Sequence, residues 1–254
     1  YNIELILSSK MMGRTITETE SLLVSSRNVP AGIEAGVIPH DEIKIILSET
    51  SVEGVVSKLA KYDYGVILMK YLDDYQKTGD LGPMMSAIHE AYYQKLLESL
   101  KFFQGDEGVI RELIRAEIDK KNILNLLKAK ESNVGKEILS EHLIDIGRIP
   151  AKELLDIYET KDVVEIIGRI ESYYKLNEAL EQYKTENSLI IFEIELTKLI
   201  NTNYVKKLRN IALSIGTIFY FIFRAEYEYE NLKRITYGKR YDLSLDKIKE
   251  MLLI

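Results

Sequence analysis

The sequence contains no cysteine and no tryptophan, and only 4 prolines and 14 glycines among its 254 residues. The lack of cysteine excludes disulfides, cysteine metal ligands and thiol catalysis, and it fits a protein kept in a reducing cytoplasm. So few prolines and glycines favour long helices over a turn-rich β protein. Because 46% of the residues are hydrophobic and 29% are charged, we expect a sizeable core rather than a disordered chain.

Positive charge is not in excess either. The formal net charge is −6 at pH 7, which argues against a nucleic-acid partner. The longest apolar run, Ile211–Phe223, is shorter than the roughly 18 residues that a membrane-spanning helix needs. We therefore predict a buried core helix over this run, with an interfacial membrane segment as the alternative.

Catalytic signatures are also missing from the sequence. It has no phosphate-binding loop, no Gly-x-Ser-x-Gly motif and no dinucleotide-binding fingerprint. The three histidines, His40, His89 and His142, lie far apart in the chain, so we expect surface or packing roles for them. The sequence predicts no metal, no cofactor and no small-molecule substrate.

One pattern occurs three times: Asn, an aliphatic residue, two variable positions, an aliphatic residue, two variable positions, a small residue and Lys. The copies begin at Asn2, Asn122 and Asn231, and the last two lie 109 residues apart. The apolar positions have helical spacing, so we interpret each copy as the helix that ends one of three related units. Asn231 borders an apolar stripe, and a buried amide generally needs hydrogen-bond partners. We predict that the three asparagines tie helices together; a binding role is the alternative.

A second set of matches, at an offset of 111 residues, relates the bodies of two units. Gly-x-Ile-Pro stands at residues 36–39 and again at 147–150. The apolar pairs that follow are Ile46 with Ile157, Val52 with Val163, Val55 with Ile166, and Leu59 with Ile170. Their helical spacing predicts an all-α chain of repeated bundles, with matched positions buried alike and both prolines at helix starts.

The same spacing predicts individual helices. They cover residues 17–25, 66–76, 84–103, 109–130, 176–183, 188–208 and 217–238, with a further helical pattern inside 241–254. Thr17 and Glu20 have the spacing of a capping box, and Gly65 is placed to end a short helix.

The last long helix carries a cluster of carboxylates. Glu226 and Glu230 share one face, and Glu230 has the i,i+4 spacing for an ion pair with Arg234. An enzyme that uses two carboxylates as acid and base is one interpretation. We prefer a solvated helix face, because early glutamates and the late Lys233 and Lys239 complement the helix dipole.

These motifs together resemble the C subunit of archaeal (A-type) ATP synthases, the equivalent of the d subunit of vacuolar (V-type) ATPases. The similarity rests on the helix ends Arg115–Lys130 and Glu226–Lys239, on both Gly-x-Ile-Pro motifs, on Tyr62–Gly65 and on Tyr92–Leu97, in this order. It covers nearly the whole chain. Members of that family have three complete lobes. The resemblance therefore implies a first-lobe remnant and connector at 1–32, a second lobe at 33–143 and a third at 144–254, with an N-terminal truncation.

The resemblance also implies a function. The lobes would form a pseudo-threefold funnel, a non-catalytic central-stalk (rotor) subunit on the cytoplasmic face of the cell membrane. The D and F subunits of the central shaft would dock in its mouth, and it would pass torque to the membrane rotor ring of proteolipid subunits during ATP turnover coupled to ion transport. Candidate partner-binding residues are Glu117, Asp119, Glu226, Glu230 and Arg234. A helical-repeat scaffold unrelated to rotary ATPases explains the same repeats and is the alternative.

Overall fold

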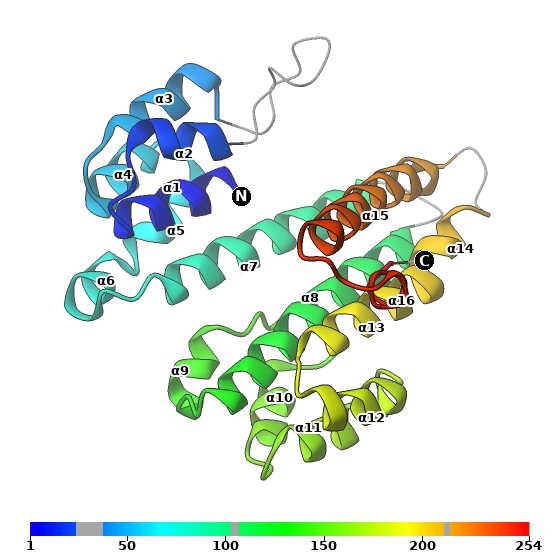
Figure 1. Ribbon diagram of the computed structural model, residues 1–254. Coiled ribbons are helices and arrows are strands. Elements are labelled where there is room, and N and C mark those ends of the chain that lie inside the picture. Colours follow the sequence, from blue (N-terminus) through cyan, green and yellow to red (C-terminus); the bar gives the residue numbers. More distant parts are fainter. Residues whose placement is uncertain (24–37, 103–106, 211–213, 254) are drawn as a thin grey trace. The chain divides into compact units, whose positions relative to one another are not determined.

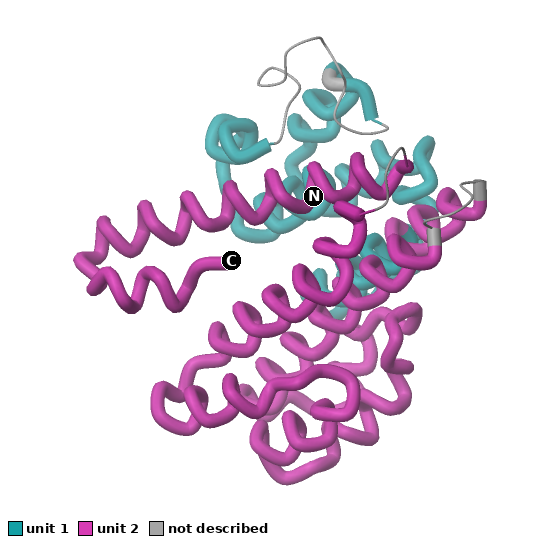
Figure 2. The backbone as a smooth tube through the Cα atoms, turned by 90° about the vertical axis from the view of Figure 1, so that its right-hand side faces the viewer, with its two compact units in different colours: residues 1–91 teal, residues 92–254 magenta. Residues whose placement is uncertain are grey.

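The computed structural model describes residues 1–23, 38–102, 107–210 and 214–253, and all regular structure in these segments is helical (Figure 1). Internal contacts define two compact units, unit 1 at Tyr1–Ala91 and unit 2 at Tyr92–Ile254 (Figure 2). The boundary falls inside one helix, α7 (Gly82–Ser99). The all-α prediction is confirmed, whereas the lobe boundaries expected from the repeat stay a prediction.

Unit 1 is a bundle of short helices. In order they are α1 (Asn2–Met11), α2 (Ile16–Leu22), α3 (His40–Ser48), α4 (Val52–Leu59), α5 (Asp63–Met69), α6 (Leu72–Thr78) and most of α7. Helix α1 packs on α4, and Ile6 and Leu7 of α1 are buried in one cluster with Val55 and Leu59. The first copy of the repeated pattern is therefore covered by the helices that follow it.

Unit 2 contains two clusters of buried side chains joined by one long helix. Its elements are η2 (Leu100–Phe102), α8 (Glu107–Glu131), α9 (Lys136–Glu141), α10 (Ala151–Tyr158), α11 (Val163–Ile170), α12 (Asn177–Glu186), α13 (Ile190–Ile200), the π-helical η3 (Asn201–Val205), α14 (Lys206–Leu208), α15 (Ile215–Arg240) and α16 (Leu245–Glu250). The second half of α8 packs with α9–α13, and its first half packs with α13, η3, α14 and α15. Helix α8 is thus buried on most of its faces.

The 111-residue repeat is confirmed where its bodies are described. Helices α4 and α11 cover matching residues, and α3 and α10 both follow an N-cap proline, Pro39 or Pro150. The matched apolar pairs are buried alike: Val52 is 2% exposed and Val163 6%, while Leu59 and Ile170 are both 0% exposed.

Two local features predicted from the sequence, the capping box at Thr17 and Glu20 and the helix end at Gly65, differ in the structure. The capping box joins Thr15 and Glu18, because Thr15 Oγ1 accepts from Glu18 N at 3.3 Å and the Glu18 carboxylate accepts from Thr15 N at 2.9 Å. The pattern Thr-x-x-Glu fits this register as well as the predicted one at Thr17 and Glu20. Gly65 lies inside α5 and does not end a helix; a Cβ there would meet the Leu59 carbonyl oxygen at 2.0 Å.

Three predicted helix ranges also need correction. The single helix expected at 66–76 is two, α5 and α6, and the one at 188–208 contains the π-helical η3. The apolar run Ile211–Phe223 does not form a buried helix in its described part, since Ile218, Phe221 and Ile222 are 60%, 72% and 53% exposed. Residues 211–213 lie outside the described segments. No helix among those described is both long and apolar enough to cross a membrane.

Candidate functional site

The repeated pattern folds into the same helix–turn–helix three times: α1–α2, α8–α9 and α15–α16 (Figure 1). Each turn places one residue in the left-handed region, namely Gly13 (φ 66°), Asn133 (φ 53°) and Asp242 (φ 52°). The next residue's N–H donates back to the carbonyl of the small residue of the pattern, at 2.9 Å in each copy. Such left-handed endings satisfy carbonyls at a helix end, so each copy has a defined stop and a fixed second helix.

Asn122 and Asn231 make matching bonds to the backbone that follows the second helix. Asn122 Nδ2 donates to the Ile144 carbonyl at 2.8 Å, and its Oδ1 accepts from Ile144 N at 3.0 Å. Asn231 does the same with Leu253, at 3.2 Å and 2.7 Å. Each amide therefore serves one backbone donor and one acceptor 22 residues further on. The corresponding position after Asn2 is Val24, which lies outside the described residues.

The lysine of the pattern reaches from its own helix to the pair of helices that follows the helix–turn–helix. We call this pair, α3–α4 or α10–α11, the body. Lys10 Nζ donates to the Leu47 carbonyl at 2.6 Å, and Lys130 Nζ donates to the Tyr158 carbonyl at 3.0 Å. Leu47 and Tyr158 occupy matching positions, 111 residues apart, at the ends of α3 and α10. Each lysine satisfies a carbonyl at the end of a helix that has no partner within that helix. These two lysines join each helix–turn–helix to its next body.

Asp119 lies in the core and not on the surface where a partner could bind it. Its side chain is 0% exposed; Oδ1 accepts from Arg148 N at 2.9 Å and Ile149 N at 3.1 Å, and Oδ2 accepts from the Tyr174 hydroxyl at 2.7 Å. Burial raises the pKa of Asp119 to about 6, although these three bonds and the Arg148 charge oppose the shift. A Cβ on Gly147 would meet Oδ1 at 2.3 Å, which explains the glycine of the second Gly-x-Ile-Pro motif.

Glu117 and Glu226 lie near each other in unit 2. Glu117 pairs with Lys120 at 2.6 Å, and the pKa of Glu226 is raised by burial and by the neighbouring Glu117 charge. The side chain of Glu226 still keeps contact with solvent. Beside them the Tyr227 hydroxyl is buried without a hydrogen-bond partner among the described residues. Around Glu226, the charges of Glu117 and Glu230 therefore raise its pKa, and the charge of Lys120 lowers it.

Glu230 and Arg234 do not form the ion pair that their spacing predicted. Glu230 pairs with Lys233 at 2.9 Å, and Arg234 Nη1 donates to the Met251 carbonyl at 2.6 Å. Since Met251 directly follows α16, Arg234 holds the end of that helix on α15. Arg234 thus has a structural partner inside the helix–turn–helix, and Glu230 remains part-exposed beside a cation.

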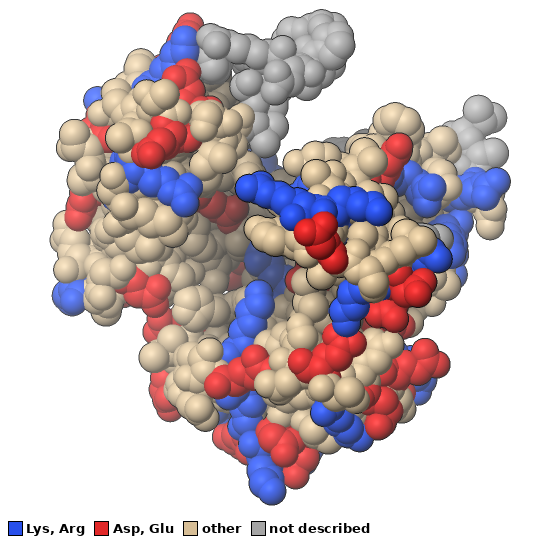
Figure 3. Space-filling model, in the orientation of Figure 1, with Lys and Arg blue, Asp and Glu red and all other residues tan. Residues whose placement is uncertain are grey.

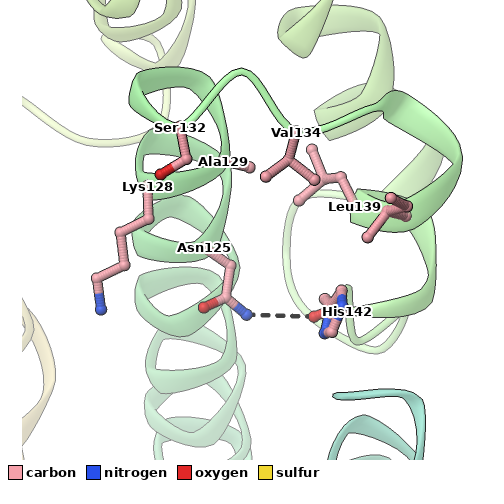
Figure 4. Close-up of a pocket in the computed structure, with 8 residues that line it drawn as sticks. Asn125, Lys128, Ala129, Ser132, Val134, Leu139 and His142 are labelled. Carbon is pink, nitrogen blue, oxygen red and sulfur yellow. Dashed lines mark hydrogen bonds between the residues drawn. The ribbon is translucent and has the colours of Figure 1, made fainter. Parts of the chain in front are cut away.

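The described chain also has a small hollow between the end of α8 and α9 (Figure 4). Its volume is about 260 Å³, and its walls include Lys128, Ser132, Val134 and Leu139. Asn125 Nδ2 donates to the His142 carbonyl at 3.2 Å across one side. One histidine, His142, and no carboxylate stand among the residues that line it.

Among the described residues, neither a group of metal ligands nor a charged surface patch indicates another candidate site. Within the described segments no group of three or more His, Asp or Glu side chains could hold a metal ion. The His89 imidazole contacts the Glu4 carboxylate. On the face shown in Figure 3, basic side chains gather over the end of α15, while acidic and basic side chains are mixed over α9–α12. The helix–turn–helix copies are therefore the candidate functional elements.

Comparison with known proteins identifies the family. The profile of the family described as ATP synthase (C/AC39) subunit matches residues 1–251. The A-type ATP synthase C subunit of Thermoplasma volcanium is 34% identical over 252 residues, which cover 99% of this chain and 71% of the relative. That of Thermoplasma acidophilum is 34% identical over 238 residues, 94% of this chain and 67% of the relative. That of Methanocaldococcus jannaschii is 27% identical over 256 residues, and the match covers 62% of its length.

The all-helical repeat and these matches define a non-catalytic subunit of an A/V-type ATP synthase. The chain belongs to the ATP synthase (C/AC39) subunit family. The resemblance noted in the sequence is thereby confirmed, and the unrelated scaffold and the acid–base enzyme are set aside.

The roles of Asp119, Lys10 and Lys130 do not emerge from the sequence alone. The lysines belong to the repeated pattern, so their recurrence at the end of every copy is the available signal. Asp119 gives a weaker signal: it precedes Asn122 by three residues and lies on the same helix face. Only the fold shows that Asp119 and Lys130 project toward the body that follows α9.

Proposed function

We propose that this chain is a central-stalk (rotor) subunit that links the central shaft to the membrane rotor ring and transmits torque. The observation that supports this proposal is the family match over residues 1–251. The helix–turn–helix copies fit the role, because Asn122 and Asn231 each tie two backbone groups of their own copy, and Lys10 and Lys130 each bond the helices that follow theirs. A part that passes torque must resist bending, and such ties stiffen it.

The proposed partners are the D and F subunits of the shaft and the proteolipid subunits of the rotor ring, with the protein on the cytoplasmic face of the membrane. The relatives' names place those proteins in A-type ATP synthases, which supports an assembled role for this chain. Co-purification tests it: a tagged chain should retain the D and F subunits and the ring subunits. Their absence from the purified material, with the chain folded, would contradict the rotor role.

The proposed docking surface for the shaft includes Glu117, Glu226 and Glu230. Asp119 is not included, because it is buried and fully bonded, and Arg234 holds α16. The shaft end would then offer basic or amide groups. Charges at the rim of an interface mainly affect the association rate and its salt dependence.

Binding kinetics of Glu226→Lys with Glu230→Lys test this surface. Association with purified shaft subunits should slow, and the rate should depend less steeply on salt. The control is Glu178→Lys with Glu181→Lys on α12, which changes the net charge equally at exposed positions. Equal slowing of both variants would indicate a general charge effect, and wild-type kinetics in the first variant would move the docking surface elsewhere. Circular dichroism verifies that both variants fold.

A further inference from the structure

Unit 2 has two ends, and among its described helices only α8 and α13 contribute side chains to the buried clusters of both. Helices α10–α12 belong to one cluster, with Ile166 and Leu180, whereas η3, α14 and α15 belong to the other, with Val205 and Leu208. Figure 1 shows α10–α12 beside the end of α8 and α14 beside its start. We call these groups the α10–α12 end and the η3–α15 end. Side chains that contact both ends can make them move together.

The Arg148 side chain contacts both ends. It lies in the connection between α9 and α10, and its Nη1 donates to the Tyr204 hydroxyl of η3 at 2.7 Å. Its guanidinium carbon lies 5.7 Å from the centroid of the Tyr174 ring and 5.9 Å from that of the Tyr204 ring. Tyr174 is buried in the cluster of the α10–α12 end, and Tyr204 packs against the other cluster. A planar guanidinium can stack on aromatic rings while it donates hydrogen bonds, so one side chain serves both clusters.

Arg148 is also fixed to α8, through its backbone and through its side chain. Arg148 N donates to Asp119 Oδ1 at 2.9 Å, and the Tyr174 hydroxyl donates to the other oxygen of that carboxylate at 2.7 Å. Arg148 Nε lies 3.5 Å from a carboxylate oxygen of Glu112. Because Glu112 and Asp119 lie two turns apart on one face of α8, they fix the position of the arginine along that helix.

The first body has no such arginine. At the offset of 111 residues, Arg148 matches Val37 and Tyr204 matches Tyr93. Val37 lies outside the described segments, but a valine side chain has neither an N–H group nor a charge. The contact between one arginine and two tyrosines therefore belongs to the second body alone, and the Gly-x-Ile-Pro motif does not require it. A contact that the repeat does not require points to a role specific to unit 2.

We infer that the Arg148 side chain couples the two ends of unit 2, so that loosening the η3–α15 end also loosens the α10–α12 end. Parts of a protein with separate buried clusters can open separately unless contacts join them. The contacts of Arg148 with Tyr174 and Tyr204 cannot both persist when one end opens alone, so they disfavour separate opening. This coupling is a property of the folded chain and holds whether or not the chain is a rotor subunit.

Amide hydrogen exchange under native conditions, followed by mass spectrometry, tests the coupling. Leu208→Ala perturbs the η3–α15 end, because Leu208 of α14 is 0% exposed in its cluster. The readout is the exchange rate of α11 (Val163–Ile170) at the other end. With Arg148 present, Leu208→Ala should speed this exchange about tenfold or more. In an Arg148→Met background, the same substitution should change it by less than about twofold. The ratio of the two rates cancels any general loss of stability in Arg148→Met.

Lys247→Met is the matched control. Lys247 of α16, which packs on α15, forms an ion pair with Glu186 of α12 at 2.5 Å and so also joins the two ends. Its side chain is 43% exposed and that of Glu186 is 38% exposed, and exposed ion pairs contribute little to stability. The response of α11 to Leu208→Ala should therefore persist in a Lys247→Met background. Its loss there would assign the coupling to the surface pair and overturn the role of Arg148.

Tyr204→Phe is a second variant, because it removes only the hydroxyl that accepts from Arg148 and keeps the ring. It should give an intermediate response, and it serves as the test if Arg148→Met does not fold. A full response to Leu208→Ala in both the Arg148→Met and the Tyr204→Phe backgrounds overturns the inference. So does an α11 exchange rate that Leu208→Ala leaves unchanged when Arg148 is present.

Discussion

Helices α8 and α15 carry the same pattern and end in the same turn, but α8 is buried and α15 is largely exposed. The turn and the asparagine tie are present in both, so they depend on residues inside the helix–turn–helix. Burial differs because α8 is followed by α10–α11, whereas no body of that kind covers α15 in the described chain. Local sequence therefore sets the form of each copy, and the next body sets how much that copy contributes to stability.

The largest expected difference is between Asp119→Ala and Glu228→Ala, at matching positions. Removing Asp119 leaves the Arg148 and Ile149 N–H groups and the Tyr174 hydroxyl without their buried acceptor. We expect a loss of about 3–5 kcal/mol in the free energy of unfolding at neutral pH. Glu228 is exposed, so its removal should change stability by no more than about 0.5 kcal/mol. Urea unfolding curves measure both, and similar losses would contradict the comparison.

The pH dependence of stability gives a second test of the difference between Asp119 and Glu228. In the folded chain the pKa of Asp119 is raised from 3.8 to about 6, mainly by burial. Between these values the unfolded state has released the proton and the folded state still holds it, so stability falls as pH rises through this window. The difference corresponds to about 3 kcal/mol. Asp119→Asn should abolish this decline relative to wild type, while Glu228→Gln should keep it. A wild-type pH profile in Asp119→Asn would show that Asp119 titrates normally.

The comparison also shows what the sequence can and cannot predict. Matching residues such as Val52 and Val163 are buried alike, since helical periodicity and a repeat both constrain which side of a helix faces the core. The sequence alone places Asp119 on a docking surface, because its helix is amphipathic and its bonding partners lie 29 to 55 residues away in the chain. The sequence also places the apolar run at 211–223 in the core. Hydrophobicity favours burial, but it does not show which element would cover the run. Periodicity does not show which residues far apart in the chain contact each other.

The two asparagines should differ less than the two carboxylates. Asn122→Leu leaves the Ile144 N–H and C=O unpaired at a site that is 0% exposed, at a cost of about 2–3 kcal/mol. Asn231→Leu breaks the same two bonds to Leu253, but the site is only part-buried and water can replace them, so about 1 kcal/mol is expected. Thermal melts of both variants provide the test. Unchanged melting temperatures would mean that these amides serve binding instead.

The smallest expected effect concerns the two lysines. Lys130→Met removes the bond to the Tyr158 carbonyl and the contact of the ammonium with the Tyr158 ring, whose centroid lies 4.9 Å from Nζ. Methionine keeps most of the apolar stem, so the loss should be about 1 kcal/mol in the free energy of unfolding. Lys239→Met should leave the 254-residue chain unchanged, because its side chain is exposed. Lys10→Met serves as the positive control, since Lys10 bonds Leu47 in the same way. If Lys239→Met destabilised the 254-residue chain as much as Lys130→Met, α15 would already be covered there, and the contrast between the two helices would be wrong.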